Sequence, residues 1–197
     1  MLPTLLSLLS FALIATISPG GATTLATASG AQFGLRRSLP LIAGIALGLG
    51  SLVGAVAAGL STLLQAWPPL ELWLRIGGSI YLLSLAAMIG RQGAPGRRPG
   101  ASAPFGLFSG LLLLWINPKA WAMAVATAST YSGLSRSPLV LALVAGVVFA
   151  AAAASSLTLW CSGGAWLTRL IKTESQWRAV NITLALLLAA SVALMWH

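Results

Sequence analysis

The sequence predicts an all-α integral membrane protein with six transmembrane helices, arranged as two inverted repeats of three helices each. Composition is the first observation: 58% of the 197 residues are hydrophobic and 7% are charged, whereas a soluble domain carries about a quarter charged residues. The second is a set of apolar runs of about 20 residues, the length that crosses a bilayer. These runs begin near Pro3, Leu39, Leu70, Pro104, Pro138 and Trp177. The third is that a proline interrupts the first run at Pro19 and the fourth run at Pro118.

Basic residues gather in alternate connections between these runs, and the chain has 11 Lys and Arg residues against 2 Asp and Glu residues. The first, third and fifth connections hold Arg36, Arg37, Arg91, Arg97, Arg98, Arg169, Lys172 and Arg178. The other connections hold only Arg75 and Arg136. The positive-inside rule therefore predicts cytoplasmic first, third and fifth connections, with both termini periplasmic or extracellular. Because the charges are dispersed over loops and form no single face, a nucleic acid is not an expected partner.

The first apolar run could also be a cleaved signal peptide, which has a positive start, a short apolar region and a small-residue cleavage site. No Lys or Arg precedes Arg36. We therefore expect the run to be retained as the first span.

A linker divides this single transmembrane domain, residues 1–197, into two halves. The segment "GRQGAPGRRPGASAP", Gly90 to Pro104, is rich in Gly, Pro and Arg and cannot span a bilayer. Repeat one is expected over residues 1–90 and repeat two over residues 104–197, with a cytoplasmic linker over residues 91–103 between them.

A shift of 99 positions aligns "ISPGGATTLATASGAQFGLRRSLPL" with "INPKAWAMAVATASTYSGLSRSPLV", so that Pro19 meets Pro118 and Gly34 meets Gly133. An odd number of spans inverts the second copy, and substrate sites in such folds lie near the membrane midplane, where the repeats meet. Chance similarity between two Ala-, Leu- and Gly-rich segments is the alternative.

The prolines are expected to open the first and fourth helices. Pro19 lacks a backbone donor, and Gly20 and Gly21 tolerate conformations that other residues avoid. Broken helices persist within a membrane only where they are buried in protein or line a wet cavity. Ser18 and Asn117 precede the prolines and are residue types that cap a helix start. Each new half-helix would then direct its positive end at an anionic group such as a carboxylate.

Lys119 is the only charged residue well inside a predicted span. Intramembrane ionisable residues are costly and indicate function by default. The alternative is that Lys119 extends to the membrane interface from a helix with a different register.

The chain resembles the LysE-type amino-acid exporters, the lysine exporter and homoserine/threonine efflux family, over essentially its whole length. The resemblance rests on "ISPGG", "GLRRSLPLIAGIALGLG", the Arg-bearing central loop, "WINPKAWAMAVA" and the last span, which opens "QWRAVN". It implies a small carrier of the bacterial inner membrane, without enzymatic activity or cofactor. Such a carrier expels amino acids or related metabolites by secondary transport, with the proton as coupling ion.

Two departures from the family pattern bear on the substrate. Members usually read Pro-Gly-Pro in the first span, where this chain has Gly21 in the third position. Members also commonly carry an Asp shortly after the "GIALG" stretch, where this chain has Leu49, Gly50 and Ser51. A buried carboxylate would be the natural proton carrier and the natural partner of a cationic side chain.

The two acids of the chain, Glu71 and Glu174, lie four positions before Arg75 and Arg178, the spacing of surface ion pairs on a helix. With no other acid in the chain, a neutral or zwitterionic substrate is favoured over a basic one.

The predicted substrate site contains residues of both breaks and no metal ligand or catalytic residue. It comprises Ser18, Pro19, Gly20, Gly21, Thr23, Thr24, Asn117, Pro118, Lys119 and Trp121. We expect the second break to hold the ligand and the first to move around it. For Thr23 and Thr24 the alternative role is hydrogen bonding between helices, and for Trp121 it is packing or anchoring.

Other functional classes remain open beside the exporter. A transmembrane redox carrier needs a pair of cysteines and a metal exporter needs a His- or acid-rich segment, whereas the chain has one Cys, Cys161, and one His, His197. A membrane channel or a non-transporting membrane protein would not need the two breaks. The expected partners are a small-molecule substrate, the coupling ion and the lipid bilayer, and a homodimer is left open.

Overall fold

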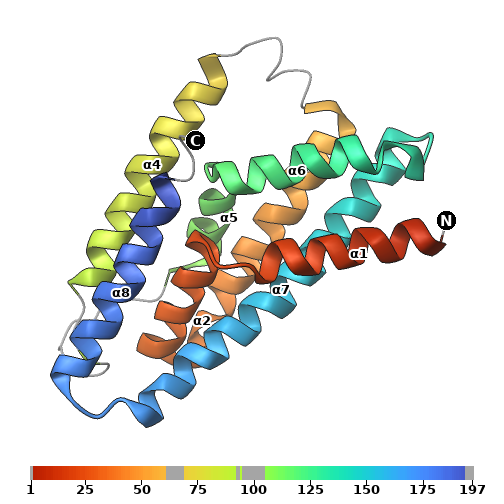
Figure 1. Ribbon diagram of the computed structural model, residues 1–197. Helices are drawn as coiled ribbons and strands as arrows, with labels where there is room; N and C mark the ends of the chain where they lie inside the picture. Colours follow the sequence, from red (N-terminus) through yellow and green to blue (C-terminus); the bar gives the residue numbers. More distant parts are fainter. Residues whose placement is uncertain (1, 61–68, 92–93, 95–104, 194–197) are drawn as a thin grey trace.

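The protein is all-helical in a computed structural model that describes residues 2–60, 69–91, 94 and 105–193 (Figure 1). The described part contains α1 (Leu2–Ile17), α2 (Gly21–Ala55), α4 (Pro69–Gly90), α5 (Leu107–Trp115), α6 (Pro118–Thr130), α7 (Pro138–Leu170) and α8 (Glu174–Ala193). A π-helical turn, Val56–Leu60, extends α2, and a 3-10 turn, Ser132–Leu134, lies between α6 and α7. The expectation of an all-α chain is confirmed.

The helices are interrupted at the two prolines that the sequence singled out. α1 ends at Ile17 and α2 begins at Gly21, with Pro19 in the break between them. α5 ends at Trp115 and α6 begins at Pro118, and the two helices are bent by 65°. Proline causes both interruptions, because it cannot donate the helical hydrogen bond and its ring clashes with the preceding turn.

A third interruption lies inside α2, near the predicted connection between the first two spans. Gly34 has φ 76° and ψ 168°, outside the helical region. The hydroxyls of Ser29 and Ser38 lie 2.7 Å apart, although nine residues of straight helix would separate them by about 13 Å. The chain therefore folds back at Gly34, and residues 21–33 and 35–55 form two helical segments.

This fold-back corrects the predicted connection between the first two spans. The sequence led us to expect a loop containing Arg36 and Arg37, followed by a helix from Leu39. Instead a single glycine makes the turn, and both arginines lie in the helix that follows it. Glycine permits this because its φ value is one that side-chain-bearing residues rarely adopt.

The core lies where α2 packs against α7 and α5, while α1 packs against α7 (Figure 1). Glycines allow backbones to meet at these contacts: a Cβ at Gly30 would overlap the carbonyl of Cys161, and one at Gly44 would overlap the carbonyl of Leu107. Because lipid tails are as apolar as the side chains, helix association in a membrane depends on such close packing. α4 and α8 form a separate pair, side by side in Figure 1.

The described helices suit a multi-pass membrane protein. Two stretches, Gly21–Gly59 and Pro138–Leu170, are long and apolar enough to cross a bilayer, although the first contains the fold-back at Gly34. The bent α5–α6 pair would be a third. α1 and residues Ile76–Gly90 are shorter apolar helices. These lengths do not test the six-span inverted repeat, which stays a prediction. Most of the 91–103 linker lies outside the described residues.

Two neighbouring glycines on α7 give a matched test of this packing. A Cβ at Gly164 would overlap the carbonyl of Thr27, whereas one at Gly163 meets nothing within 4 Å. We expect Gly164→Ala to lower the free energy of unfolding by about 1–3 kcal/mol, the cost of overpacking. Gly163→Ala should leave it unchanged or raise it by up to about 1 kcal/mol, because alanine favours a helix more than glycine does. Thermal unfolding midpoints of the two variants in one detergent measure the difference, and equal midpoints would contradict this packing.

Candidate functional site

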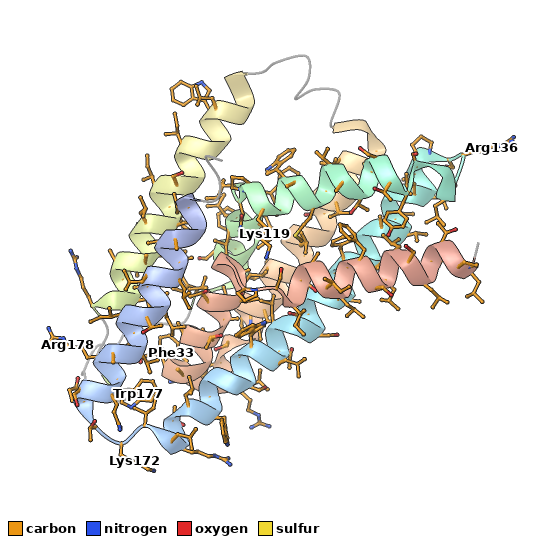
Figure 2. All side chains as sticks on the ribbon, viewed as in Figure 1. Phe33, Lys119, Arg136, Lys172, Trp177 and Arg178 are labelled. Carbon is orange, nitrogen blue, oxygen red and sulfur yellow. The ribbon has the colours of Figure 1, made fainter. Side chains whose placement is uncertain are left out.

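The two helix breaks are joined by the side chain of Lys119. It extends from the first turn of α6 to the junction of α1 and α2 (Figure 2). Its Nζ donates to the Ser18 hydroxyl at 2.8 Å, the Ser18 carbonyl at 3.1 Å and the Pro19 carbonyl at 3.2 Å. An ammonium group has three N–H donors, so this arrangement uses all of them. Lys119 is therefore held within the protein.

The first break satisfies part of its backbone locally. The Ser18 N–H donates to the Ile14 carbonyl and the Ser18 hydroxyl donates to the Ala15 carbonyl. The Gly20 N–H donates to the Thr23 hydroxyl at 2.8 Å, and this hydroxyl donates back to the Gly20 carbonyl at 2.9 Å. Ser18 therefore closes the end of α1, and Thr23 supports the start of α2.

This arrangement corrects the predicted capping role of Ser18. The cap position of α2 is Gly20, not Ser18. Serine hydroxyls bond to nearby backbone groups in several local patterns, and here the hydroxyl turns back to the helix that ends rather than to the one that begins.

The remaining carbonyls at the end of α1 receive donors from the second half of the chain. The Thr16 carbonyl accepts from the Ser156 hydroxyl at 2.9 Å, and the Ile17 carbonyl accepts from Trp160 Nε1 at 3.1 Å. Lys119 Nζ donates to the next two carbonyls, those of Ser18 and Pro19. Since an unpaired carbonyl in a membrane costs several kcal/mol, these contacts stabilise a helix end that could not stand alone.

The second break is capped as predicted. Asn117 Oδ1 accepts from the Lys119 backbone N–H at 3.0 Å, and Pro118 occupies the first turn of α6, where a missing donor does no harm. The Asn117 Nδ2 atom lies beside Gly21, 3.8 Å from the position that a Cβ on Gly21 would take. The Trp115 carbonyl accepts from Trp121 Nε1 at 2.7 Å. This tryptophan therefore supports the break from its own helix.

A cavity lies between the breaks and offers about 40 Å³ to the centres of water-sized molecules. Its lining includes the polar residues Thr16, Ser18, Thr23, Asn117 and Lys119, together with Gly20 and Gly21. Its apolar lining is Ala15, Ala22, Ile45, Leu49, Leu114, Ala120, Met123, Ala153 and Leu157. Each water needs about 10–15 Å³ of this kind of volume, so the cavity has room for about three waters.

Lys119 is the only ionisable residue in this lining. Leu49, in the region where LysE-type exporters commonly carry an Asp, contributes a hydrophobic wall. No three His, Cys, Asp or Glu residues lie together anywhere in the described part of the chain. The site therefore combines one positive charge with neutral polar and apolar groups.

Most of the predicted set meets at this cavity. Ser18, Gly20, Gly21, Thr23, Asn117 and Lys119 line it. Pro19 contributes its carbonyl to Lys119, while Pro118, Thr24 and Trp121 lie outside the lining. Thr24 is buried within α2, and the Trp121 ring packs edge-on against Trp115 at 6.3 Å between centroids.

Sequence reasoning missed Thr16 and the apolar wall. Ile45 and Leu49 on α2, and Ala153 and Leu157 on α7, are each four residues apart, the spacing that places two side chains on one helix face. That periodicity could have indicated a shared surface. It could not have separated a cavity wall from the rest of the core, because both are apolar.

The two predicted ion pairs remain predictions. Glu71 and Arg75 lie outside the described side chains. Glu174 accepts a hydrogen bond from the Ala94 backbone N–H at 3.4 Å, and Arg178 is exposed.

Comparison with known proteins gives the family. The model of the LysE type translocator family matches residues 13–195. This chain belongs to that family. It is therefore a translocator of the bacterial inner membrane that crosses the bilayer several times, and it is not an enzyme.

Two relatives illustrate the similarity. A protein of Klebsiella pneumoniae subsp. pneumoniae, named cysteine/O-acetylserine efflux protein, is 31% identical over 190 residues, 95% of each chain. A protein of the same name from Escherichia coli strain K12 is 30% identical over 191 residues, again 95% of each chain. No solved structure matches this chain.

Adjacent serines on α7 test the contact between the halves. Ser156→Ala removes the donor of the buried Thr16 carbonyl, and we expect a loss of about 1–3 kcal/mol of unfolding free energy. Ser155 donates to the Ala151 carbonyl of its own helix and is exposed, so Ser155→Ala should be nearly neutral. The thermal unfolding midpoints of both variants test this difference. An unchanged midpoint for Ser156→Ala would show that the Ser156–Thr16 contact does not stabilise the protein.

Proposed function

We propose that this protein exports small neutral or zwitterionic amino acids, or close relatives of them, by secondary transport across the bacterial inner membrane. The observation that carries the proposal is the cavity between the two helix breaks, in which Lys119 is the only ionisable lining residue. Family membership and the names of the relatives support export of amino acids.

The lining favours a carboxylate at one end of the ligand. Lys119 brings a positive charge, Asn117 Nδ2 is an amide donor at the cavity, and the start of α6 carries the positive end of a helix dipole. Carboxylates bind well to such groups through charge-assisted hydrogen bonds. These groups would thus orient the acid end of an amino acid.

The same lining disfavours a basic side chain. No carboxylate lines the cavity, and Leu49, Met123 and Leu157 face the space where a side chain would lie. Burying a second positive charge there without a partner would cost several kcal/mol. The compounds named in the relatives, cysteine and O-acetylserine, are zwitterions without a basic side chain, which supports this preference.

For the architecture, we propose two inverted repeats of three spans. Repeat one consists of α1 with residues 21–33, then residues 35–55, then α4. Repeat two consists of α5 with α6, then α7, then α8. The equivalent breaks at Pro19 and Pro118 and the paired third helices, α4 and α8, support this assignment.

For the orientation, we propose that the first, third and fifth connections face the cytoplasm. Phe33, Lys172 and Arg178 lie at one end of the molecule, and Arg136 lies at the opposite end with the N-terminus (Figure 2). The hydrogen bond between Ala94 and Glu174 puts the start of the linker beside the start of α8. Basic connections at one end support a cytoplasmic side there.

Transport requires the cavity to face the two sides of the membrane in turn. We propose that repeat one moves around a ligand held by repeat two, with the proton gradient as the driving force. A homodimer stays a prediction.

A metabolite panel tests the substrate class. In a host lacking its own exporters, we expect the protein to raise excretion of neutral amino acids such as cysteine or O-acetylserine. Excretion of lysine and arginine should be at least about tenfold lower. Burying their unpaired side-chain charge costs several kcal/mol, and about 1.4 kcal/mol already lowers affinity tenfold. Collapse of the proton gradient should abolish export. Strong lysine or arginine export without neutral export would refute the proposal.

Lys119→Met tests the role of the positive charge. We expect export to fall at least about tenfold, since a hydrogen bond to a charged group contributes about 1.5–3 kcal/mol. Lys172→Met, which removes the exposed lysine near α8, is the matched control and should export normally. Size-exclusion chromatography checks that each variant is folded. A folded Lys119→Met with normal export would show that the Lys119 charge is not needed for transport.

A further inference from the structure

We propose that the three oxygens now bound to Lys119 form the site for the substrate's α-ammonium group, and that Lys119 occupies this site when no substrate is bound. These oxygens, the Ser18 carbonyl, the Ser18 hydroxyl and the Pro19 carbonyl, are called the oxygen cage below. The part that concerns the substrate rests on the proposed function. The existence of an ammonium site does not.

The geometry of the oxygen cage suits a primary ammonium. The three oxygens lie 2.8, 3.1 and 3.2 Å from Lys119 Nζ, within the range of N–H···O hydrogen bonds. They follow the last turn of α1, where the negative end of the helix dipole favours a cation. A primary ammonium with three N–H donors matches three acceptors.

The charge of the cavity favours an exchange of ammonium groups. A zwitterion brings one ammonium and one carboxylate, while the lining has one ammonium, Lys119, and no carboxylate. If Lys119 leaves the oxygen cage to pair with the substrate carboxylate, the substrate ammonium can take its place. Every buried charge then keeps a partner, whereas an unpaired charge at any stage would be costly.

Gly20 leaves room for Lys119 beside the oxygen cage. A Cβ at Gly20 would stand 3.2 Å from Lys119 Nζ and 3.4 Å from Lys119 Cδ. A side chain there would press on the lysine and hinder its displacement. Pro19 is exposed at the same break, so its carbonyl lies near the protein surface.

This exchange predicts that a ligand needs both groups. A compound with only a carboxylate would leave the oxygen cage without a cation, and one with only an ammonium would meet a site that Lys119 already fills. Removing Lys119 should therefore make the oxygen cage available to a simple amine, which gives a binding test that does not depend on export.

The test uses purified full-length Lys119→Met with ethylammonium chloride as the probe. Tetramethylammonium chloride, which has no N–H donor, and sodium chloride at the same concentration are the controls. We expect ethylammonium alone to raise the thermal midpoint of Lys119→Met, by about 2–4 °C. Wild type and Lys172→Met should shift by less than about 1 °C, because Lys119 fills their oxygen cage. Adding Ser18→Ala to Lys119→Met removes one oxygen and should at least halve the shift.

Three results would overturn the inference: no ethylammonium shift in Lys119→Met, an equal shift with tetramethylammonium or sodium, or an equal shift in wild type. If Lys119→Met is lost during purification, the readout becomes recovery of monodisperse protein with ethylammonium in all buffers. Lack of ethylammonium-specific recovery in both Lys119→Met and Lys119→Gln would then overturn it. If neutral amino acids are exported but ethylammonium does not shift Lys119→Met, the proposed function stands and this inference fails. If ethylammonium shifts Lys119→Met but no neutral amino acid is exported, the ammonium site stands and the proposed function fails.

Discussion

The end of α1 is a set of backbone carbonyls that need hydrogen-bond donors, and the second half of the chain supplies them. A helix end on a soluble protein can use water, but hydrocarbon offers no donor. Here the donors are Ser156, Trp160 and Lys119, all from the second half of the chain. The first break therefore has its observed shape only while α6 and α7 are in place. Folding of the site and association of the two halves are one event.

The second break is built differently, with hydrogen-bond partners that lie closer in the chain. Asn117 caps α6 and Trp121 reaches the Trp115 carbonyl, so its hydrogen bonds come mostly from its own helix pair. The first break instead depends on distant side chains, and Lys119 is one of them. A change in the contacts of that one lysine alters the first break more than the second, which fits the expectation that repeat one moves around repeat two.

The sequence predicted the features that are local in the chain. Pro19 and Pro118 interrupt helices whatever surrounds them, and a lone lysine in an apolar run is conspicuous. The prediction that Ser18 caps the start of α2 was wrong, because a serine hydroxyl can bond to the helix on either side of it and here bonds to α1. The sequence also did not predict the turn at Gly34, where one glycine replaces a loop, because Arg36 and Arg37 had suggested a solvated connection. The donors Ser156 and Trp160 lie about 140 residues from their acceptors, so no local pattern reveals them.

The oxygen cage consists largely of main-chain atoms, which every residue type possesses. A point substitution can remove the Ser18 hydroxyl, but it leaves the carbonyls of Ser18 and Pro19 in place as long as the helix stays open there. The wall formed by Leu49, Met123 and Leu157 consists of side chains and changes with every substitution. Within one such scaffold, evolution could therefore revise the wall freely while the end of α1 stayed chemically the same. Descendants of an ancestral exporter would then differ in which side chain they admit and agree in how they hold the charged end that all amino acids share.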